Sequence, residues 1–296
     1  MRRLNWIRDG IALSFLPDFG GKIDTLRLIE SSRNVLAGAF RLPLGISFED
    51  HAFGFDECFP TVSSCLHSGI QWPDHGELWN TPWSFEFQGE ALLMEVSGKK
   101  APYLFKRRLT IKETTLRIDY EVVSENPLSA LWSAHPLLRV RPGSRILLPP
   151  EVESLLIAGS EGNRLGKPGD RCSWPIFEDI SIDVLDHPKK GWADKLFTDA
   201  LSQGSCGLLD AESEEFVIFR FDPKLTPYLG LWICQGGWPA SRPFEDFTVA
   251  LEPCSGRPDS LAEAAGQDAC QLLQPGKPLR WWLEIELGKN PGISIL

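Results

Sequence analysis

The sequence has little of several features that would point to other classes of protein. Basic residues are outnumbered, with 30 Lys and Arg against 40 Asp and Glu, so the net charge is −10. A chain this acidic is a poor candidate for holding nucleic acid or an anionic membrane by bulk charge. No apolar run reaches the roughly 18 residues of a membrane-spanning helix. We therefore expect neither a nucleic-acid partner nor a membrane partner.

Cysteine motifs and dinucleotide motifs are missing as well. The seven cysteines are scattered and none forms a C-x-x-C pair, which argues against a zinc knuckle or a thioredoxin-type redox motif. There is no G-x-G-x-x-G and no alternation of strands with helices, so a dinucleotide-binding fold is not expected. The first residues lack the apolar core of a secretory signal, so we expect reduced thiols and a cytoplasmic location.

Tryptophan, phenylalanine and turn-forming residues are abundant instead. The 296 residues include 11 Trp and 17 Phe against 3 Tyr and 2 Met, with 23 Pro and 26 Gly. Tryptophan offers a flat apolar surface on which a ligand can stack. The many Gly and Pro predict a chain that turns often.

Strand patterns dominate the chain. Alternating residues on both sides of Pro17–Gly21 predict a hairpin, and Leu116–Val123 alternates with the period of two typical of a half-buried antiparallel strand. One helix is predicted in Arg257–Ala265, where Ser260 and Glu263 have the spacing of a capping box. We expect one all-β domain over residues 1–296, a large antiparallel sandwich with this short helix, and a long excursion from about Glu151 to Asp199.

Three residues stand out as candidates for acid–base chemistry. His75 lies in a loop rich in Trp, Gly and acidic residues, His135 lies in an apolar strand, and Glu252 ends another. Each also has a structural explanation. His75 could cap a turn, His135 could be a satisfied core residue, and Glu252 could pair with Arg242 or Arg257.

The order of these motifs along the chain resembles that of the aldose 1-epimerases, also called galactose mutarotase-like proteins. The resemblance runs from Pro17–Lys22 to Leu287 and implies a β-supersandwich. Its short motifs in this sequence are His75-Gly76, His135-Pro136, Glu252 with Pro258-Asp259, and the turn Leu273-Gln274-Pro275-Gly276.

The resemblance implies specific roles for these residues. Glu252 would be the base that takes the proton of the anomeric hydroxyl, and His135 the acid that protonates the ring oxygen. His75 would hold the ring oxygen or a neighbouring hydroxyl. No cofactor or metal is implied, and the partner is a small-molecule sugar. The other residues expected to bind substrate are Asp56, Glu57, Trp79, Asp194 and Trp232.

The sequence also departs from the family pattern. Leu137-Leu138 replaces the Tyr-Phe that follows the second His in the family, and the family's upstream Arg has no clear match near Asp56 and Glu57. A non-catalytic carbohydrate-binding or sensing protein on the same fold is therefore the alternative.

Two further alternatives concern the substrate. A polysaccharide lyase or glycoside hydrolase would use Asp56 or Glu57 as a second catalytic carboxylate. A hexose phosphate could meet Arg139 and Arg141, although a solvated basic face is the favoured explanation of that pair. The chain could also form a homodimer.

Overall fold

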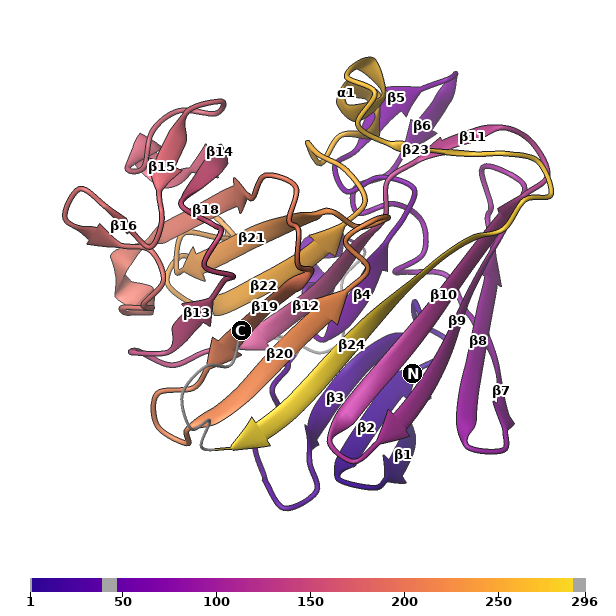
Figure 1. The fold of residues 1–296 in the computed structure, drawn as a ribbon, viewed down its shortest axis with the longest axis horizontal. Coiled ribbons are helices and arrows are strands. Elements are labelled where there is room, and N and C mark those ends of the chain that lie inside the picture. The colour runs from indigo at the N-terminus through magenta and orange to yellow at the C-terminus, as the bar shows by residue number, and fades with distance from the viewer. Residues whose placement is uncertain (1, 39–46, 290–296) are drawn as a thin grey trace.

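Antiparallel β-strands make up most of the computed structural model, which describes residues 2–38 and 47–289. In this part of the chain, ten strands form one sheet and eight form a second. The two sheets pack as layers around the main hydrophobic core (Figure 1). The predicted all-β antiparallel sandwich is therefore confirmed, while a single domain spanning residues 1–296 stays a prediction.

The larger sheet has the strand order β1-β2-β3-β4-β12-β22-β21-β18-β14-β15. Its strands are β1 (Leu4–Arg8), β2 (Ile11–Leu16), β3 (Lys22–Leu28), β4 (Phe55–Cys58), β12 (Ser133–Arg139), β14 (Ser154–Ser160), β15 (Arg171–Ser173), β18 (Trp192–Phe197), β21 (Tyr228–Gln235) and β22 (Phe247–Cys254).

The smaller sheet has the strand order β13-β19-β20-β24-β10-β9-β8-β7. Its strands are β7 (Ser84–Gln88), β8 (Ala91–Ser97), β9 (Tyr103–Lys112), β10 (Thr115–Ser124), β13 (Arg145–Leu147), β19 (Ser205–Leu209), β20 (Glu215–Phe221) and β24 (Leu279–Lys289). Three short pairs complete the strands, namely β5 (Cys65–His67) with β6 (Ile70–Trp72), β11 (Leu128–Ala130) with β23 (Gln271–Leu273), and β16 (Ile176–Phe177) with β17 (Ile180–Ser181).

The structure confirms the hairpin and the half-buried strand that the alternating residues predicted. β2 and β3 form the predicted hairpin around Pro17–Gly21. In β10, Leu116, Ile118, Tyr120 and Val122 are all buried, and the residues between them are partly exposed. One face of this strand therefore packs on the core, as a period of two requires.

The predicted helix is shorter than expected, and the segment predicted as an excursion belongs to the sandwich. The helix α1 spans Leu261–Gly266, and the Ser260 side chain accepts a hydrogen bond from the Glu263 amide at its start. The excursion is not separate from the sandwich, because β14, β15 and β18 lie within Glu151–Asp199 and extend the larger sheet. The prediction that residues 151–199 form an excursion from the sandwich was therefore wrong.

The central strands of the larger sheet are buried on both faces. All of Thr248–Cys254 in β22 is buried. Val249 and Leu251 belong to the main core, whereas Ala250 joins Leu137 and the partly buried Trp232 in a separate apolar cluster. Because neighbouring residues of a strand point to opposite faces, this second cluster covers the face turned away from the core.

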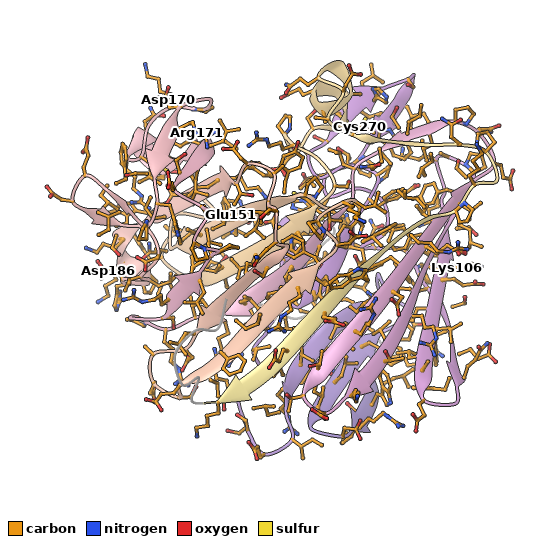
Figure 2. The ribbon with its side chains drawn as sticks, in the orientation of Figure 1. Lys106, Glu151, Asp170, Arg171, Asp186 and Cys270 are labelled. Atoms are coloured by element: carbon orange, nitrogen blue, oxygen red, sulfur yellow. The ribbon has the colours of Figure 1, made fainter. Side chains whose placement is uncertain are left out.

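Side chains fill the space between the layers, and several charged residues lie at the periphery (Figure 2). Figure 2 shows Asp170, Arg171 and Asp186 at the outer limit of the region formed by β14–β18. No helix within residues 2–38 and 47–289 is both long and apolar enough to cross a membrane.

Strand β4 carries Glu57 into the core. The Glu57 carboxylate accepts hydrogen bonds from Arg107 (3.1 Å), Tyr120 (3.0 Å) and Trp132 (2.8 Å). Both charged side chains are fully buried. Burial raises the pKa of Glu57, and Arg107 opposes that effect. Glu57 therefore joins the two sheets.

Removing the cation of this pair is expected to destabilise the protein strongly. Arg107→Met leaves the Glu57 carboxylate buried without a countercharge, which costs about 3–5 kcal/mol of unfolding free energy. The matched control is Arg108→Met, because Arg108 follows directly and is exposed on the opposite face. The control should stay within about 0.5 kcal/mol of the parent. Urea unfolding measures both, and equal stabilities for the two variants would contradict the assignment.

Candidate active site

A cavity of about 820 Å³ lies on the outer face of the larger sheet. The adjacent strands β12, β22, β21 and β18 form its floor, and loops that include Ser47–Ala52 and Pro73–Asn80 form its walls. The predicted residues that line it together are His75, His135, Glu252, Trp79 and Trp232. Residues from four distant parts of the sequence therefore converge on one cavity.

His135 and Glu252 lie side by side on adjacent strands. The pairs Ser133 with Cys254 and Leu137 with Ala250 fix the register of β12 against β22. Between these pairs, His135 Nε2 lies 4.0 Å from Glu252 Oε1. That separation is too long for a direct hydrogen bond, and it places an acid and a base at the same point of the cavity.

His75 is held in the wall by a backbone turn that needs a glycine next to it. His75 (φ 58°) and Gly76 (φ 71°) are both in the left-handed region. The His75 amide donates to the Val62 carbonyl at 2.5 Å. A Cβ at Gly76 would lie 2.1 Å from the Phe59 carbonyl oxygen, so only glycine fits there. This explains why His and Gly occur as a pair.

A ring from the opposite wall covers His75. Phe48 stacks on the His75 imidazole with a centroid distance of 3.4 Å and an interplanar angle of 8°. His75 Nδ1 lies 3.0 Å from an Asp74 carboxylate oxygen, and its ring lies 5.2 Å from that of His135. Phe48 was not among the residues predicted from the sequence, because an apolar side chain in a loop gives no indication of a site.

Tryptophan side chains supply much of the apolar wall. Trp79, Trp232 and Trp238 line the cavity, and the rings of Trp232 and Trp238 meet edge to face at 6.0 Å. The Trp79 indole nitrogen donates to the Asp74 carbonyl at 3.1 Å, which orients that ring beside His75. Flat rings at fixed angles suit the apolar face of a sugar.

Asp194 does not line the cavity, whereas its neighbour Lys195 does. The Asp194 carboxylate pairs with Arg164 and accepts a hydrogen bond from Ser160 Oγ at 2.7 Å. Lys195, on the other face of β18, pairs with Glu252 and lies 3.6 Å from Asp259 Oδ2. The alternatives Arg242 and Arg257 for pairing with Glu252 are thus replaced by Lys195. Alternation along the strand implies that only one of Asp194 and Lys195 can face the cavity. The strand register determines that it is Lys195.

Asp56 lies on the cavity side of β4, opposite His135 on β12, but does not line the cavity. It forms a fully buried ion pair with Lys22. Lys22 also donates to the His51 and Phe53 carbonyls, both at 2.8 Å. Asp56 and Glu57 are thus both engaged in structural ion pairs, so we give neither a direct role toward substrate.

The surroundings shift the pKa values of both His135 and Glu252. Burial holds the pKa of His135 well below its ordinary value of 6.5, and the charges on His75 and Lys195 lower it further. Burial raises the pKa of Glu252 above its ordinary value of 4.5, with Lys195 acting in the opposite direction. Burial thus shifts the two pKa values in opposite directions, and titratable groups perturbed in this way inside a cavity are typical of functional sites.

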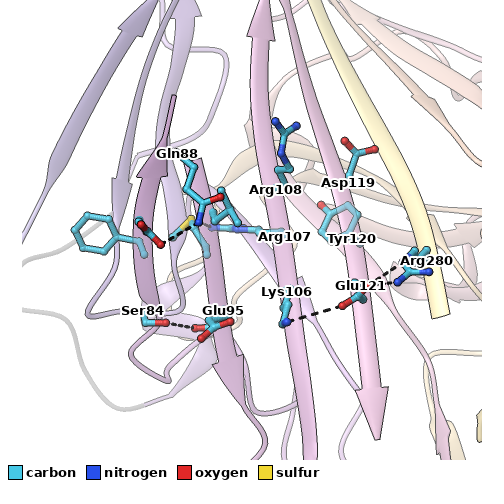
Figure 3. Close-up of a pocket in the computed structure, with 14 residues that line it drawn as sticks. Ser84, Gln88, Glu95, Lys106, Arg107, Arg108, Asp119, Tyr120, Glu121 and Arg280 are labelled. Atoms are coloured by element: carbon cyan, nitrogen blue, oxygen red, sulfur yellow. Dashed lines mark hydrogen bonds and ion pairs between the residues drawn. The ribbon is translucent and has the colours of Figure 1, made fainter. Parts of the chain in front are cut away.

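A second cavity, of about 580 Å³, lies on the outer face of the smaller sheet (Figure 3). Its charged groups neutralise one another, since Glu121 lies 2.6 Å from Arg280 and 3.9 Å from Lys106. It contains none of the candidate acid–base residues. Within the described ranges 2–38 and 47–289, no group of three or more His, Cys, Asp or Glu is arranged to hold a metal ion.

Comparison with known proteins gives matches in structure alone. No family model matches the sequence, and no curated protein matches it. The Slr1438 protein of Synechocystis has 16% identity and a TM-score of 0.74, covering 98% of this chain and 97% of its own. A galactose mutarotase related enzyme of Lactobacillus acidophilus has 15% identity and a TM-score of 0.72, with 100% of both chains covered.

A galactose mutarotase-like protein of Lactobacillus casei has 12% identity and a TM-score of 0.69, covering 97% of this chain and 100% of its own. These likenesses span almost the whole chain. The fold is therefore the galactose mutarotase-like supersandwich that the order of motifs implied.

The lowered pKa of His135 predicts a definite direction for stability. Between that pKa and 6.5, the unfolded chain binds a proton at this position that the folded chain does not, so stability falls as pH falls through this window. Imidazole NMR titration, with the His135 signal assigned from His135→Gln, should give a midpoint well below 6.5. A midpoint at or above 6.5 would contradict the burial argument.

Proposed function

We propose that this protein is an aldose 1-epimerase, which interconverts the α and β anomers of an uncharged hexose or a related sugar. The observation that carries the proposal is the position of Glu252 Oε1 and His135 Nε2, 4.0 Å apart in a cavity that His75 also lines. The fold shared with mutarotase-like proteins supports it.

The reaction requires only proton transfer. Glu252 Oε1 accepts the proton of the C1 hydroxyl, the O1 electrons form the C1=O bond, and the bond from C1 to the ring oxygen breaks. His135 Nε2–H gives its proton to that ring oxygen as it leaves. Rotation about C1–C2 presents the other face of the aldehyde. The same groups then return the protons in reverse as the ring closes.

The pKa directions define the reactive form of the protein. The reaction starts from ionised Glu252 and protonated His135. Because burial lowers the pKa of His135 well below 6.5, its protonated form is a minor one at neutral pH. An imidazolium of low pKa is in turn a stronger acid, which partly offsets its low population. His75 is placed to hydrogen-bond the ring oxygen or a neighbouring hydroxyl.

The charge of the cavity favours an uncharged substrate. Among the described lining residues, four carboxylates, those of Glu49, Asp74, Glu252 and Asp259, face a single ammonium, that of Lys195. Lys195 is already paired with two of those carboxylates. A phosphate would therefore meet repulsion without a compensating cation. Neither Arg139 nor Arg141 lines the cavity, and Arg141 pairs with Glu212 at 2.6 Å.

Loss of the Glu252 base is expected to remove most of the activity. Glu252→Gln keeps the shape of the side chain but cannot accept the proton, so the rate should fall by about 10²–10⁴-fold. Saturation-transfer NMR on a panel of free aldoses measures anomer exchange directly. The matched control is Glu151→Gln, because Glu151 is exposed and bonds Ser202 instead (Figure 2).

The outcome also separates the two functions considered. Accelerated exchange that Glu252→Gln abolishes and Glu151→Gln leaves intact supports the enzyme. Binding of a sugar without acceleration by the parent protein would instead support a carbohydrate-binding protein on this fold. No acceleration with any sugar in the panel would sink the epimerase proposal.

Substrate charge gives an independent prediction. The repulsion described above should make kcat/KM at least about tenfold higher for an uncharged aldohexose than for its 6-phosphate. The same exchange experiment with both sugars at equal ionic strength measures the ratio. A preference for the phosphate would show that the cavity offers a cation beyond Lys195.

A further inference from the structure

Lys195 reaches Glu252 across an intervening strand. Lys195 is on β18 and Glu252 on β22, and β21 lies between them. In the registers of these strands, Lys195 is opposite Trp232 and Glu252 is opposite Gly230. The ammonium nonetheless bonds Glu252 Oε2, and the two side chains are only 14% and 2% exposed.

The missing side chain at Gly230 makes this contact possible. A Cβ there would lie 3.0 Å from Glu252 Oε2, 3.3 Å from Lys195 Nζ and 3.2 Å from the ring of Phe197. Such a group would occupy the space between ammonium and carboxylate. Glycine in the middle of a strand is otherwise unfavourable. Here its lack of a side chain leaves the space in which the ammonium and the carboxylate meet.

We propose that Lys195 is a positioning residue for the reaction. It binds Oε2 of Glu252, turns Oε1 toward His135 and the sugar, and keeps the buried carboxylate ionised. This inference rests on the proposed epimerase activity for its purpose, while the ion pair itself can be tested without activity.

The groups around the carboxylate explain why a cation is needed there. Asp259 from the loop after β22, and Cys254 on β22 itself, face Glu252 together with Cys58 of β4. His135 of β12 and His75 of the wall lie on the open side. Burial and Asp259 disfavour the charged carboxylate, and Lys195 opposes both.

Lys195 is suited to position the base and unsuited to act as the acid. Burial disfavours its charge, but Asp259 and Glu252 outweigh that effect and raise its pKa above the ordinary value of 10.5. An ammonium with a raised pKa does not release its proton near neutral pH. The role of acid therefore stays with His135.

The first test measures the carboxylate itself. Carboxyl ¹³C NMR, with Glu252 assigned from Glu252→Gln, should show its pKa higher by roughly 1 to 3 in Lys195→Met, since an opposite charge in contact is lost. Lys195→Arg should stay close to the parent. The matched control is Lys190→Met, because Lys190 pairs with Asp186 at 2.8 Å outside the cavity.

The second test uses the pH profile of kcat/KM. Because Lys195 lowers the pKa of both Glu252 and His135, its removal should move both limbs of the bell-shaped profile to higher pH. Lys195→Arg should restore the parent profile. A purely structural role would lower activity without moving the limbs.

Gly230→Ala provides a variant that keeps the lysine. Its methyl group should separate Lys195 from Glu252 and raise the Glu252 pKa toward that of Lys195→Met, which keeps the proposal testable if Lys195→Met does not fold. A Glu252 pKa that is unchanged in the folded Lys195 and Gly230 variants would overturn the proposal. Absence of activity in the parent would instead overturn the epimerase function and leave the titration result to decide the role of Lys195.

Discussion

The central strands of the larger sheet must bury both of their faces, and the rest of the molecule follows from how they do so. One face packs on the smaller sheet, and on this face Ala134 and Leu138 of β12 and Val249 and Leu251 of β22 belong to the core. The intervening residues face loops instead of a sheet. Loops cannot fill a surface as completely as a packed sheet, and the cavity is the volume they leave. His135 and Glu252 stand on this second face because of their position in the alternation.

Buried charge is the second constraint, and ion pairing across strands satisfies it. Asp56 pairs with Lys22, Glu57 with Arg107, and Asp194 with Arg164. Each pair ties a strand to a neighbouring strand, to the opposite sheet or to a loop, since a carboxylate without its cation would be costly in the interior. The pair between Lys195 and Glu252 differs in that its carboxylate also faces the cavity.

Local patterns were enough to predict the hairpin of β2 with β3 and the half-buried strand β10, and they singled out three candidate acid–base residues. His75, His135 and Glu252 occur in short motifs whose order is visible in one sequence, and all three line the same cavity. The roles of these residues remain proposals. Lys195 and Phe48 could not be predicted in this way, because their positions depend on strand register and on the packing of one loop against another.

The same reason explains the residues that the structure places elsewhere. β4 is only four residues long and lies between Gly54 and Phe59-Pro60, so its pattern resembles a loop. Its strand character, and with it the opposite directions of Asp56 and Glu57, becomes visible only from its pairing with β12. Asp194 and Lys195 present the same ambiguity, since a shift of one residue exchanges their faces.

The stack between Phe48 and His75 joins two walls that are far apart in sequence. Phe48 belongs to the short 3-10 turn Phe48–His51, and His75 to the turn that packs on Phe59. The two loops therefore contact each other over the cavity floor formed by the larger sheet. One face of the His75 imidazole is therefore covered by a residue that lies 27 positions earlier in the chain, and the position of the 48–51 turn decides whether that face is open to the cavity.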